Sequence, residues 1–434
     1  MNTYITRAGT PDDAEEIIAV SAAAFDARPD EQSRRNMIEH AAREAGLFRI
    51  VEVNARIVSV AKVHPHRLRV GRACEVLKGD VGGVATHPDF QRRGYGHALM
   101  RDVVDWMRRE GYDLSRLVGY ARFYRRFGYV PFPRRYVAFP IGPVQAGATT
   151  VPAEDVHRAP EGLPGVLRPY DAARDAVRHG ELYEMLNGQR SGALVRDGEA
   201  ELRAQAGPLS KPDPLQVVYE VGGLVQGYAI GAEARSGIHG EQPAIAVNDV
   251  AFNPDCPEAL VAVIQHILHE ACSRSLRLVT ARMPFDEAVL SILREAGIAL
   301  RLEEAHEGLA SNMMRIVNLE SLFRKIAPEL ARRLDESGVS EWLALAGREA
   351  DVEIRVDGER VALAVAPGAV TMSDAASADG RLVTDQATLV KLIFGMLSFD
   401  EAVIAGRGEL NFVSQAVFRA WFPRQGCYGG WTLG

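Results

Sequence analysis

The spacing of hydrophobic residues along the first 130 positions alternates between the periods of strands and helices. Thr10 is followed by a proline and two acids, the usual start of a helix, and Gly111 and Gly128 end two later helical runs. Two apolar, β-branched runs flank a turn at Asn54 and Ala55, which is typical of an antiparallel hairpin. The predicted elements are a strand at 4–7, a helix at 10–25, a hairpin at 48–53 and 57–63, a strand ending at 84–86, a helix from 91 to 110, a strand at 116–120 and a short helix at 123–127.

Residues 140–164 are rich in proline and glycine and show little periodicity, which predicts a domain boundary. The next segment repeats the order of the first, with Gly222 and Gly223 at the turn of its hairpin. Its predicted elements are a hairpin at 217–230, a strand at 244–252, a helix at 257–272, a strand at 276–281 and a helix at 285–296. This pattern indicates a duplicated domain.

A third segment begins near Asn318 and has a different order of elements. Asp357 and Gly358 form a strong hairpin signal, and Asp385 begins a helix. The predicted elements are helices at 319–334 and 340–346, a hairpin at 352–366, and helices at 384–394 and 413–422. Helices beside an antiparallel sheet indicate an α+β unit. We therefore predict three domains, at residues 1–140, 165–312 and 313–434.

The length of 434 residues fits this division, because one hydrophobic core rarely serves more than about 250 to 300 residues. A content of 47% hydrophobic and 25% charged residues indicates a chain that folds throughout. The net charge of −7 argues against a nucleic-acid partner held by phosphate contacts. No run approaches the ~18 apolar residues of a membrane span, and the start does not resemble a signal peptide. We therefore predict a cytoplasmic protein with no membrane partner.

Neither the cysteines nor the histidines predict a metal site. The four cysteines lie far apart and form no C-x-x-C pair, so we expect reduced thiols rather than disulfides or a zinc site. The pair His64 and His66 and the pair His266 and His269 have spacings that suit a metal, but no third ligand is evident. We expect no bound metal.

A short basic turn carries the clearest chemical signal. Gln91 to Gly96 lies between a predicted strand and a predicted helix, where backbone N–H groups and the helix dipole can hold a pyrophosphate. Arg92 and Arg93 would add charge-assisted contacts, and Gly96 keeps the first helical turn free of a side chain. Such a turn alone is a weak signal. A second element, Phe123 to Tyr129, follows after one helix and one strand and strengthens it.

The stretch from Val84 to His97, followed by Phe123 to Tyr129, resembles the acetyl-CoA signature of the GNAT N-acetyltransferase superfamily. With its duplicated second segment and its α+β third segment, the chain is similar to the aminoglycoside-acetylating "enhanced intracellular survival" proteins. The resemblance implies an α/β chain with two tandem GNAT folds, followed by an α+β domain similar to sterol carrier proteins. It covers essentially the whole chain, but it is specific only from about Gly83 to Phe132.

The resemblance also implies a role for each matched residue. Tyr124 matches the general acid, since a departing CoA thiolate needs a proton and a phenol can donate one. An isolated tyrosine beside Phe123 and Phe127 would more often be a core residue. The carboxylate of Gly434 would be the base, although the similar proteins commonly end in an aromatic residue. The implied cofactor-binding residues are Val84, Ala85 and Thr86 for the pantetheine arm, Arg92, Arg93, Gly94, Tyr95, Gly96 and His97 for the pyrophosphate, and Gly119 and Tyr120 near the thioester.

Positions near the end of the first predicted helix suit an amine acceptor. Asp26, and with it Asp30 or Glu31, could line the acceptor cleft, and Phe25 could stack on the acceptor; solvated loop acids are the alternative. In the second segment, Asn253 to Glu258 stands where the glycine-containing turn should be. Prolines lack a donor and acids repel phosphate, so this segment is predicted to bind no CoA. The third segment would deliver the C-terminus, and lipid binding is less favoured.

These features favour an acetyl-CoA-dependent N-acetyltransferase that acts on a primary amine of a polycationic small molecule, such as an aminoglycoside or a polyamine. A protein lysine or N-terminal acetyltransferase is one alternative, and it needs a cleft open enough for a peptide. A non-catalytic acyl-CoA-binding or lipid-binding protein is another, and it would bind without turnover. The resemblance implies a symmetric homo-oligomer such as a hexamer, though no residue establishes an interface.

Overall fold

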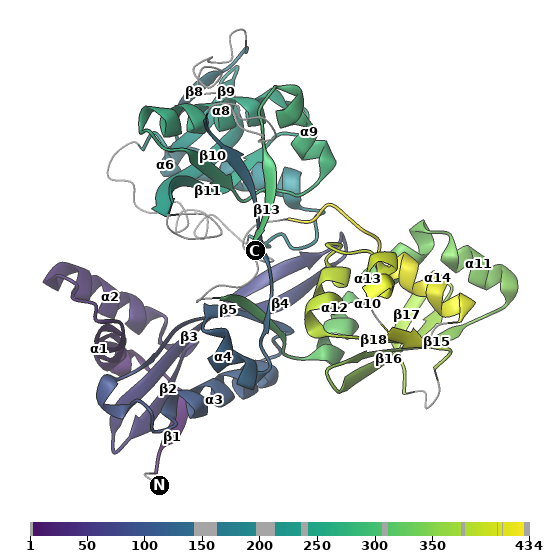
Figure 1. Ribbon diagram of the computed structural model, residues 1–434, viewed down its shortest axis with the longest axis horizontal. Helices are drawn as coiled ribbons and strands as arrows, with labels where there is room; N and C mark the ends of the chain where they lie inside the picture. The colour runs from purple at the N-terminus through teal and green to yellow at the C-terminus, as the bar shows by residue number, and fades with distance from the viewer. Residues whose placement is uncertain are drawn as a thin grey trace.

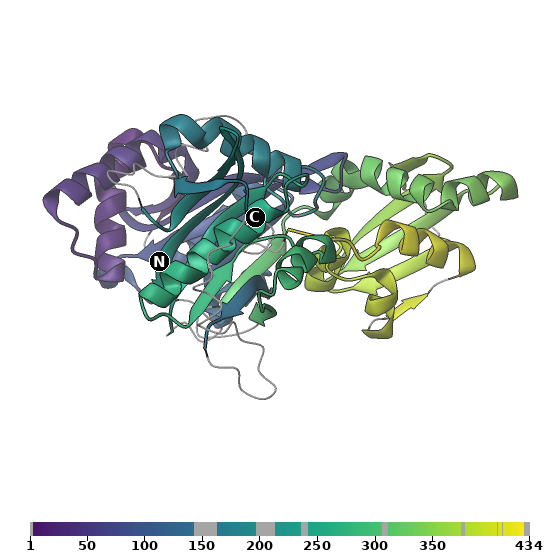
Figure 2. The ribbon, with the colours of Figure 1, turned by 90° about the horizontal axis from the view of Figure 1, so that it is seen from above.

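The described residues of the computed structural model form two seven-stranded sheets and one five-stranded sheet, each with its own helices (Figure 1). They are residues 3–142, 163–196, 213–235, 242–305, 311–374, 378–405, 407–409 and 411–428. We call the first sheet and its helices the first copy, the second sheet and its helices the second copy, and the remainder the third body. The third body extends to one side of both copies (Figure 2).

The first copy is a mixed sheet covered on both faces. On one face, α1 (Ala14–Phe25) and α2 (Glu31–Arg43) share a core cluster with β2, β3 and β4. On the other, α3 (Tyr95–Arg109) forms a second core cluster with the same sheet. The strand order is β1 (Ile5–Ala8), β2 (Phe48–Val53), β3 (Arg56–Val70), β4 (Cys74–Thr86), β5 (Leu114–Gly119), β14 (Ser311–Ile316) and β6 (Val130–Pro131).

The second copy has the same arrangement. Its helices are α6 (Ala172–Asn187), α8 (Glu258–Ser273) and α9 (Glu287–Glu295), and α8 is buried along most of its length. The strand order is β13 (Arg301–Ala305), β7 (Arg134–Pro140), β12 (Leu278–Ala281), β11 (Pro243–Phe252), β10 (Leu224–Arg235), β9 (Gln216–Val221) and β8 (Val166–Pro169). The chain therefore forms two similar units, each a sheet packed against helices, as the duplicated sequence pattern predicts.

The two copies exchange a strand. β7 lies in the first segment of the chain, yet it pairs with β12 and β13 of the second copy. β14 follows the second copy in sequence and pairs with β5 and β6 of the first. Each exchanged strand is internal to its new sheet, so neither copy completes its sheet without the other. The linear division at residues 140 and 312 therefore does not describe how the sheets are built.

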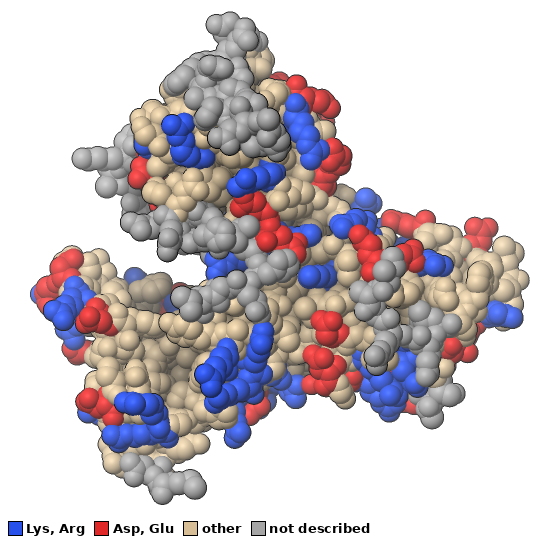
Figure 3. All heavy atoms as spheres, viewed as in Figure 1, with Lys and Arg blue, Asp and Glu red and all other residues tan. Residues whose placement is uncertain are grey.

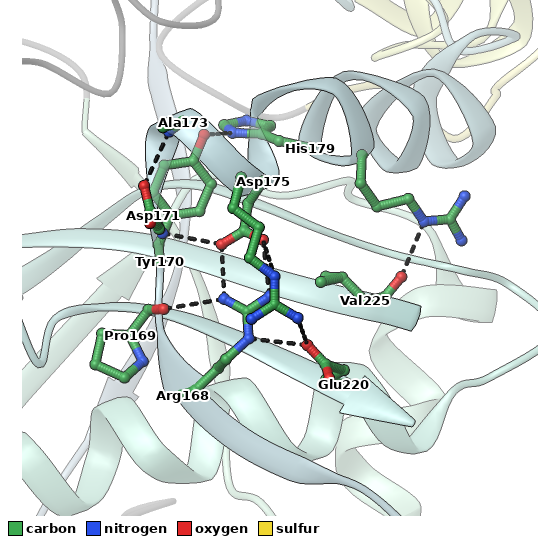
Figure 4. Close-up of polar contacts among 11 residues, drawn as sticks. Arg168, Pro169, Tyr170, Asp171, Ala173, Asp175, His179, Glu220 and Val225 are labelled. Atoms are coloured by element: carbon green, nitrogen blue, oxygen red, sulfur yellow. Dashed lines mark hydrogen bonds and ion pairs between the residues drawn. The ribbon is translucent and has the colours of Figure 1, made fainter. Parts of the chain in front are cut away.

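A repeated ion-pair frame ties the first strand of each copy to the helix that follows. In the second copy, Arg168 donates two hydrogen bonds of 2.7 Å to Asp175 and one of 2.9 Å to Glu220 (Figure 4). In the first copy, Arg7 makes the equivalent bonds to Asp13, at 2.6 and 2.8 Å, and to Glu52, at 3.0 Å. The same residue types in the same geometry mark these segments as duplicates.

The third body packs a sheet against helices and joins the first copy through a shared core. Leu68 and Cys74, at the connected ends of β3 and β4, belong to the same hydrophobic cluster as α10. The strand order is β17 (Ala369–Met372), β16 (Glu359–Ala366), β15 (Ala350–Val356), β18 (Gly380–Thr384) and β19 (Arg407–Glu409). The helices are α10 (Leu319–Glu336), α11 (Val339–Ala346), α12 (Gln386–Ile393), α13 (Phe399–Ala405) and α14 (Phe412–Trp421).

The local turn predictions are confirmed. Asn54 and Ala55 both have positive φ angles, 51° and 58°, as a tight two-residue hairpin turn requires. Asp357 and Gly358 adopt 48° and 92° in the third body. No helix in the described part of the chain combines the length and apolar character needed to cross a bilayer. The similarity of the third body to sterol carriers stays a prediction.

Candidate active site

β4 and β5 open into a V in the first copy. They pair in parallel only from Lys78 to Val81 against Leu114 to Leu117. Beyond this, β4 continues along β3 to Thr86, while β5 continues along β14 to Gly119. The edge of β4 from residue 82 to 86 therefore has no neighbouring strand among the described residues on its β5 side. We call this opening the first slot; Val84, Ala85 and Thr86, predicted to bind the pantetheine arm, form its β4 side.

The predicted phosphate turn lies at the open end of this slot, at the start of α3. Gly94 is the N-cap of α3 and has φ 88°, and Arg92 also has a positive φ of 60°. Arg92, Arg93 and Gly94 are exposed, so the first turn of α3 is accessible with its N–H groups and dipole. A Cβ on Gly96 would lie 3.3 Å from the Thr86 hydroxyl, which explains why glycine suits this position. An exposed helix N-terminus beside two arginines fits a pyrophosphate.

The other two predicted residues of this turn face inward. Tyr95 is buried in the core beneath the turn, so it supports the turn from below. The His97 ring packs against Phe127 with centroids 4.7 Å apart, and partial burial lowers the pKa of His97. The His97 contact joins α3 to the segment that carries Tyr124.

Tyr124 lies against the diverging end of β5. It is in α4 (Ala121–Tyr124), which continues as a short 3-10 turn to Phe127 and ends at Gly128 with φ 75°. A Cβ on Gly119 would come within 2.3 Å of the Tyr124 ring, so only glycine lets the ring approach the strand. Tyr120 is 69% exposed beside it. Tyr124 and the predicted cofactor residues thus meet at one end of the sheet.

Burial fixes the protonation state of Tyr124. The side chain is 8% exposed, and desolvation raises its pKa to about 12. The phenol therefore keeps its proton throughout the neutral range, which is the form that a general acid needs.

The predicted acceptor residues lie on the connection between α1 and α2 and make local contacts. Asp26 ends α1 with φ 49° and pairs with Arg28, both side chains being nearly 90% exposed. Phe25 is 61% exposed, and Asp30 accepts the N-cap hydrogen bond of α2 from Ser33. Glu31 pairs with Arg35 on the exposed side of α2. The surface is hollowed between these N-terminal helices and the second copy (Figure 3).

The sequence analysis missed a partly buried charged cluster at the apex of the first slot. Asp80 and Arg116 form the pair next to the last one that joins β4 and β5. The Asp80 carboxylate lies 3.2 Å from Lys78 Nζ, 3.5 Å from His66 Nε2 and 3.9 Å from Arg116 Nη1. Charged residues at alternate positions in the middle of a predicted strand, Lys78 and Asp80, were the signal that could have revealed it.

Two further arginines extend this cluster toward the second copy. Arg134, at the start of β7, and Arg282, just after β12, are within electrostatic range of Arg116. Burial lowers the pKa of Lys78, and it lowers that of Arg282 to about 10. Burial also lowers the pKa of His66, which keeps its imidazole neutral around pH 7. The inner wall of the first slot therefore combines a buried lysine and partly buried arginines with a neutral imidazole.

The remaining site predictions concern the C-terminus and metals. Gly434 lies outside the described residues, which end at Tyr428. Among the described residues no group of three or more His, Cys, Asp or Glu side chains is placed to hold a metal ion.

The comparison with known protein families gives a match in the first part of the chain. Residues 6–132 match the family model described as an acetyltransferase (GNAT) domain, and no curated protein matches the sequence. These residues contain the first slot, the phosphate turn and Tyr124.

Several solved structures share the fold over nearly the whole chain. A probable N-acyltransferase of unknown function from Enterococcus faecalis has a TM-score of 0.70 at 15% identity, covering 98% of both chains. A GCN5-related N-acetyltransferase from Kribbella flavida has 0.65 at 18%, covering 97% of this chain and 96% of the other. Eis1 from Mycobacterium abscessus has 0.58 at 17%, covering 99% and 100%. The domain match thus places an acetyltransferase (GNAT) domain at residues 6–132, and the solved structures show the fold that these chains share.

Proposed function

We propose that the first copy binds acetyl-CoA in the first slot and transfers the acetyl group directly to a primary amine. One observation carries this proposal: the parting of β4 and β5 places an open strand edge, an exposed helix N-terminus and a buried phenol around one opening. Each of these groups suits a different part of an acyl-CoA. Bound there, acetyl-CoA would supply an activated acetyl group as a thioester.

Different residues along the slot are proposed to contact different parts of acetyl-CoA. The backbone of Val84 to Thr86 is proposed to hydrogen-bond the pantetheine arm as an added strand would. Arg92, Arg93 and the first turn of α3 hold the pyrophosphate. Gly119 leaves room for the ring of Tyr124, whose hydroxyl then donates its proton to the departing sulfur. This arrangement needs no covalent intermediate on the protein.

An amine must lose a proton before it attacks, so a base is also needed. The terminal carboxylate of Gly434 is proposed for this role, on the resemblance given above. The C-terminal segment, as far as it is described, leaves the third body and packs on the second copy through Tyr428, whose neighbour Arg282 is in turn near Arg116. This route toward the first slot supports the proposal.

The acceptor is proposed to be a polycationic small molecule. The exposed acids Asp26, Asp30 and Glu31, on the connection between α1 and α2 and at the start of α2, support attraction of cations. The inner wall, with Lys78 and Arg116, suits a neutral amine rather than an ammonium. A cytoplasmic location and a homo-oligomer remain predictions.

The test is to mix purified protein with acetyl-CoA and a panel of aminoglycosides, polyamines and lysine peptides. Release of CoA thiol is followed against a control without acceptor. Release with a polycationic small molecule supports the proposal, and release with peptides alone favours a protein acetyltransferase. Binding of acetyl-CoA without release across the panel would favour a non-catalytic binding protein. Failure to bind acetyl-CoA would contradict the assignment of the first slot.

A further inference from the structure

Two parallel strands of the second copy part in the same way as those of the first. β11 and β12 pair in parallel up to Val247 and Ala281, as β4 and β5 do up to Val81 and Leu117. β11 then continues along β10 to Phe252, while the chain after β12 leads to α9. We call the opening beyond this last parallel pair the second slot.

A cavity of about 580 Å³ lies where the second slot ends, between the end of α6, the start of α9 and the end of β11. Its volume is within the range of about 300 to 1,000 Å³ that is usual for small-molecule sites. The apolar part of its wall includes Leu186, Phe252 and Val289, which are all buried in the core cluster of the second copy. Because core residues form this wall, the shape of the cavity is set by the packed fold.

An ion pair lines the same cavity. Arg190, shortly after α6, donates from Nε to Asp286 Oδ2 at 2.7 Å, and its Nη2 lies 2.7 Å from the same oxygen. Asp286 is the N-cap of α9, and its Oδ1 accepts from the backbone of Val289 at 2.8 Å. The two side chains are 21% and 17% exposed. Both charges are therefore held in place while a ligand in the cavity can still reach them.

Both members of this pair keep capacity for a further hydrogen bond. A guanidinium carries N–H donors on each of its nitrogens, and no described residue accepts from Nη1 of Arg190. A carboxylate has about four acceptor positions, and the contacts with Arg190 and Val289 do not fill those of Asp286. A ligand can therefore bond to each partner without breaking the pair.

The charge pattern of the cavity selects a class of ligand. The pair of Arg190 and Asp286 presents both signs of charge side by side and has no net charge. A ligand with only a carboxylate would be attracted by Arg190 and repelled by Asp286, and a ligand with only an ammonium would meet the reverse. A molecule with both groups on one carbon atom satisfies both partners. Such a molecule with an apolar side chain also matches the apolar wall.

We propose that the cavity of the second copy binds a free apolar α-amino acid. Nη1 of Arg190 donates to the carboxylate of the ligand, and the ammonium of the ligand donates to Asp286. The side chain of the ligand packs on Leu186, Phe252 and Val289. This site lies in the second copy and does not depend on the acetyl transfer proposed for the first.

Calorimetry on the full chain, without acetyl-CoA, tests the ligand class with L-leucine and two matched fragments. One fragment, 4-methylpentanoate, is leucine without its amino group, and the other, 3-methylbutylamine, is leucine without its carboxylate. Leucine should bind saturably and at least about tenfold more tightly than either fragment, because each fragment loses one charge-assisted hydrogen bond. L-Alanine, which keeps both charges, should also bind at least about tenfold more weakly, since it buries less apolar surface.

Arg190→Gln places the site, with Arg294→Gln as matched control. Arg294 also pairs with a carboxylate, that of Glu287, but it is exposed on α9 and is not among the residues that line the cavity. Arg190→Gln should weaken leucine binding about tenfold and reverse the preference, so that 3-methylbutylamine binds more tightly than leucine. The reversal follows because Asp286 then has no cationic partner in the cavity. Arg294→Gln should keep the Kd of the parent protein for leucine.

Three results would overturn the amino-acid site. They are a parent protein that does not bind leucine at millimolar concentrations, leucine that binds no better than its fragments, and a Kd for leucine that Arg190→Gln leaves unchanged. The last result would also follow if leucine bound in the first slot as an acceptor. A protein that binds leucine as expected but transfers no acetyl group would instead refute the proposed function and support this site.

Discussion

The two copies share a frame and differ in what their slots contain. Both have the Arg–Asp–Glu frame at the first strand and the same parting of two parallel strands. In the first copy the next turn has Gly94 and an exposed helix start; in the second it has Pro254 and Pro257. Near the end of β12 in the second copy, Cys427 and Tyr428 pair with Phe285 and Ser191 of the same chain. The two copies therefore share an opening between parting strands and differ in the turn that follows it.

The reacting end differs as well. Tyr124 lies in the helix after β5, a few residues beyond Leu117, where the pairing of β5 with β4 ends. Ala288 lies equally far beyond Ala281, where the pairing of β12 with β11 ends. Gly119, which makes room for the phenol, is matched by Met283. The second copy thus lacks both the acid and the space for it. Each difference can be tested by changing one copy and leaving the other intact.

The largest effect is expected from Tyr124→Phe. Loss of the proton donor should lower kcat about 100-fold, while the Kd for acetyl-CoA, measured by calorimetry, stays within twofold. Ala288→Ser is the matched change in the second copy and should leave kcat unaltered. Full turnover of Tyr124→Phe would return this tyrosine to the role of a core residue.

The double change Arg92→Ala and Arg93→Ala should weaken acetyl-CoA binding about tenfold, since two exposed charge-assisted contacts to phosphate are lost. The kcat at saturating acetyl-CoA should change little. Asp255→Ala, on the corresponding turn of the second copy, should leave the Kd unchanged. An effect of Asp255→Ala as large as that of the arginines would show that the second copy binds CoA.

Asp13→Asn should destabilise the first copy by about 1 kcal/mol at pH 7, because it breaks the paired hydrogen bonds from Arg7. Arg7 holds the pKa of Asp13 below its usual value. The stabilisation is therefore present above the unfolded pKa of about 4 and is lost as the pH falls through the folded pKa. Thermal unfolding of the variant and the parent protein should converge in strong acid. A constant difference in Tm down to pH 2 would show that the charge of Asp13 is not its cause.

The smallest effect is expected from Asp26→Asn. The side chain is 88% exposed, so its attraction for a cationic acceptor is screened by solvent and salt. The KM for a polycationic acceptor should rise about twofold at low ionic strength, and the difference should vanish at 0.5 M salt. Glu39→Gln, farther along α2, is the control for a general change in net charge. A rise in KM that persists in high salt would mean that Asp26 contacts the acceptor directly.

Local rules in the sequence determined much of the fold. Hairpin turns at Asn54 and at Asp357 were predictable because φ preferences depend on a few neighbouring residues. The start of α3 after the turn at Gly94 was predictable for the same reason, and pyrophosphate binding by this turn stays a prediction. The proposed role of Tyr124 came from the resemblance to a family. Its burial beside the end of β5 was revealed only by the structure.

What only the tertiary structure decided concerns partners far apart in the chain. β7 and β14 have ordinary strand patterns, and no local rule tells such a strand which of two similar sheets it will join. The cluster of Asp80 with Arg116, and the dock of Tyr428 beside Ser191, likewise join residues whose neighbours in sequence give no sign of the contact. Turns depend on local backbone energies, which a sequence displays directly. Strand exchange and docking depend on surfaces that exist only after the sheets have formed, so the sequence alone could not reveal them.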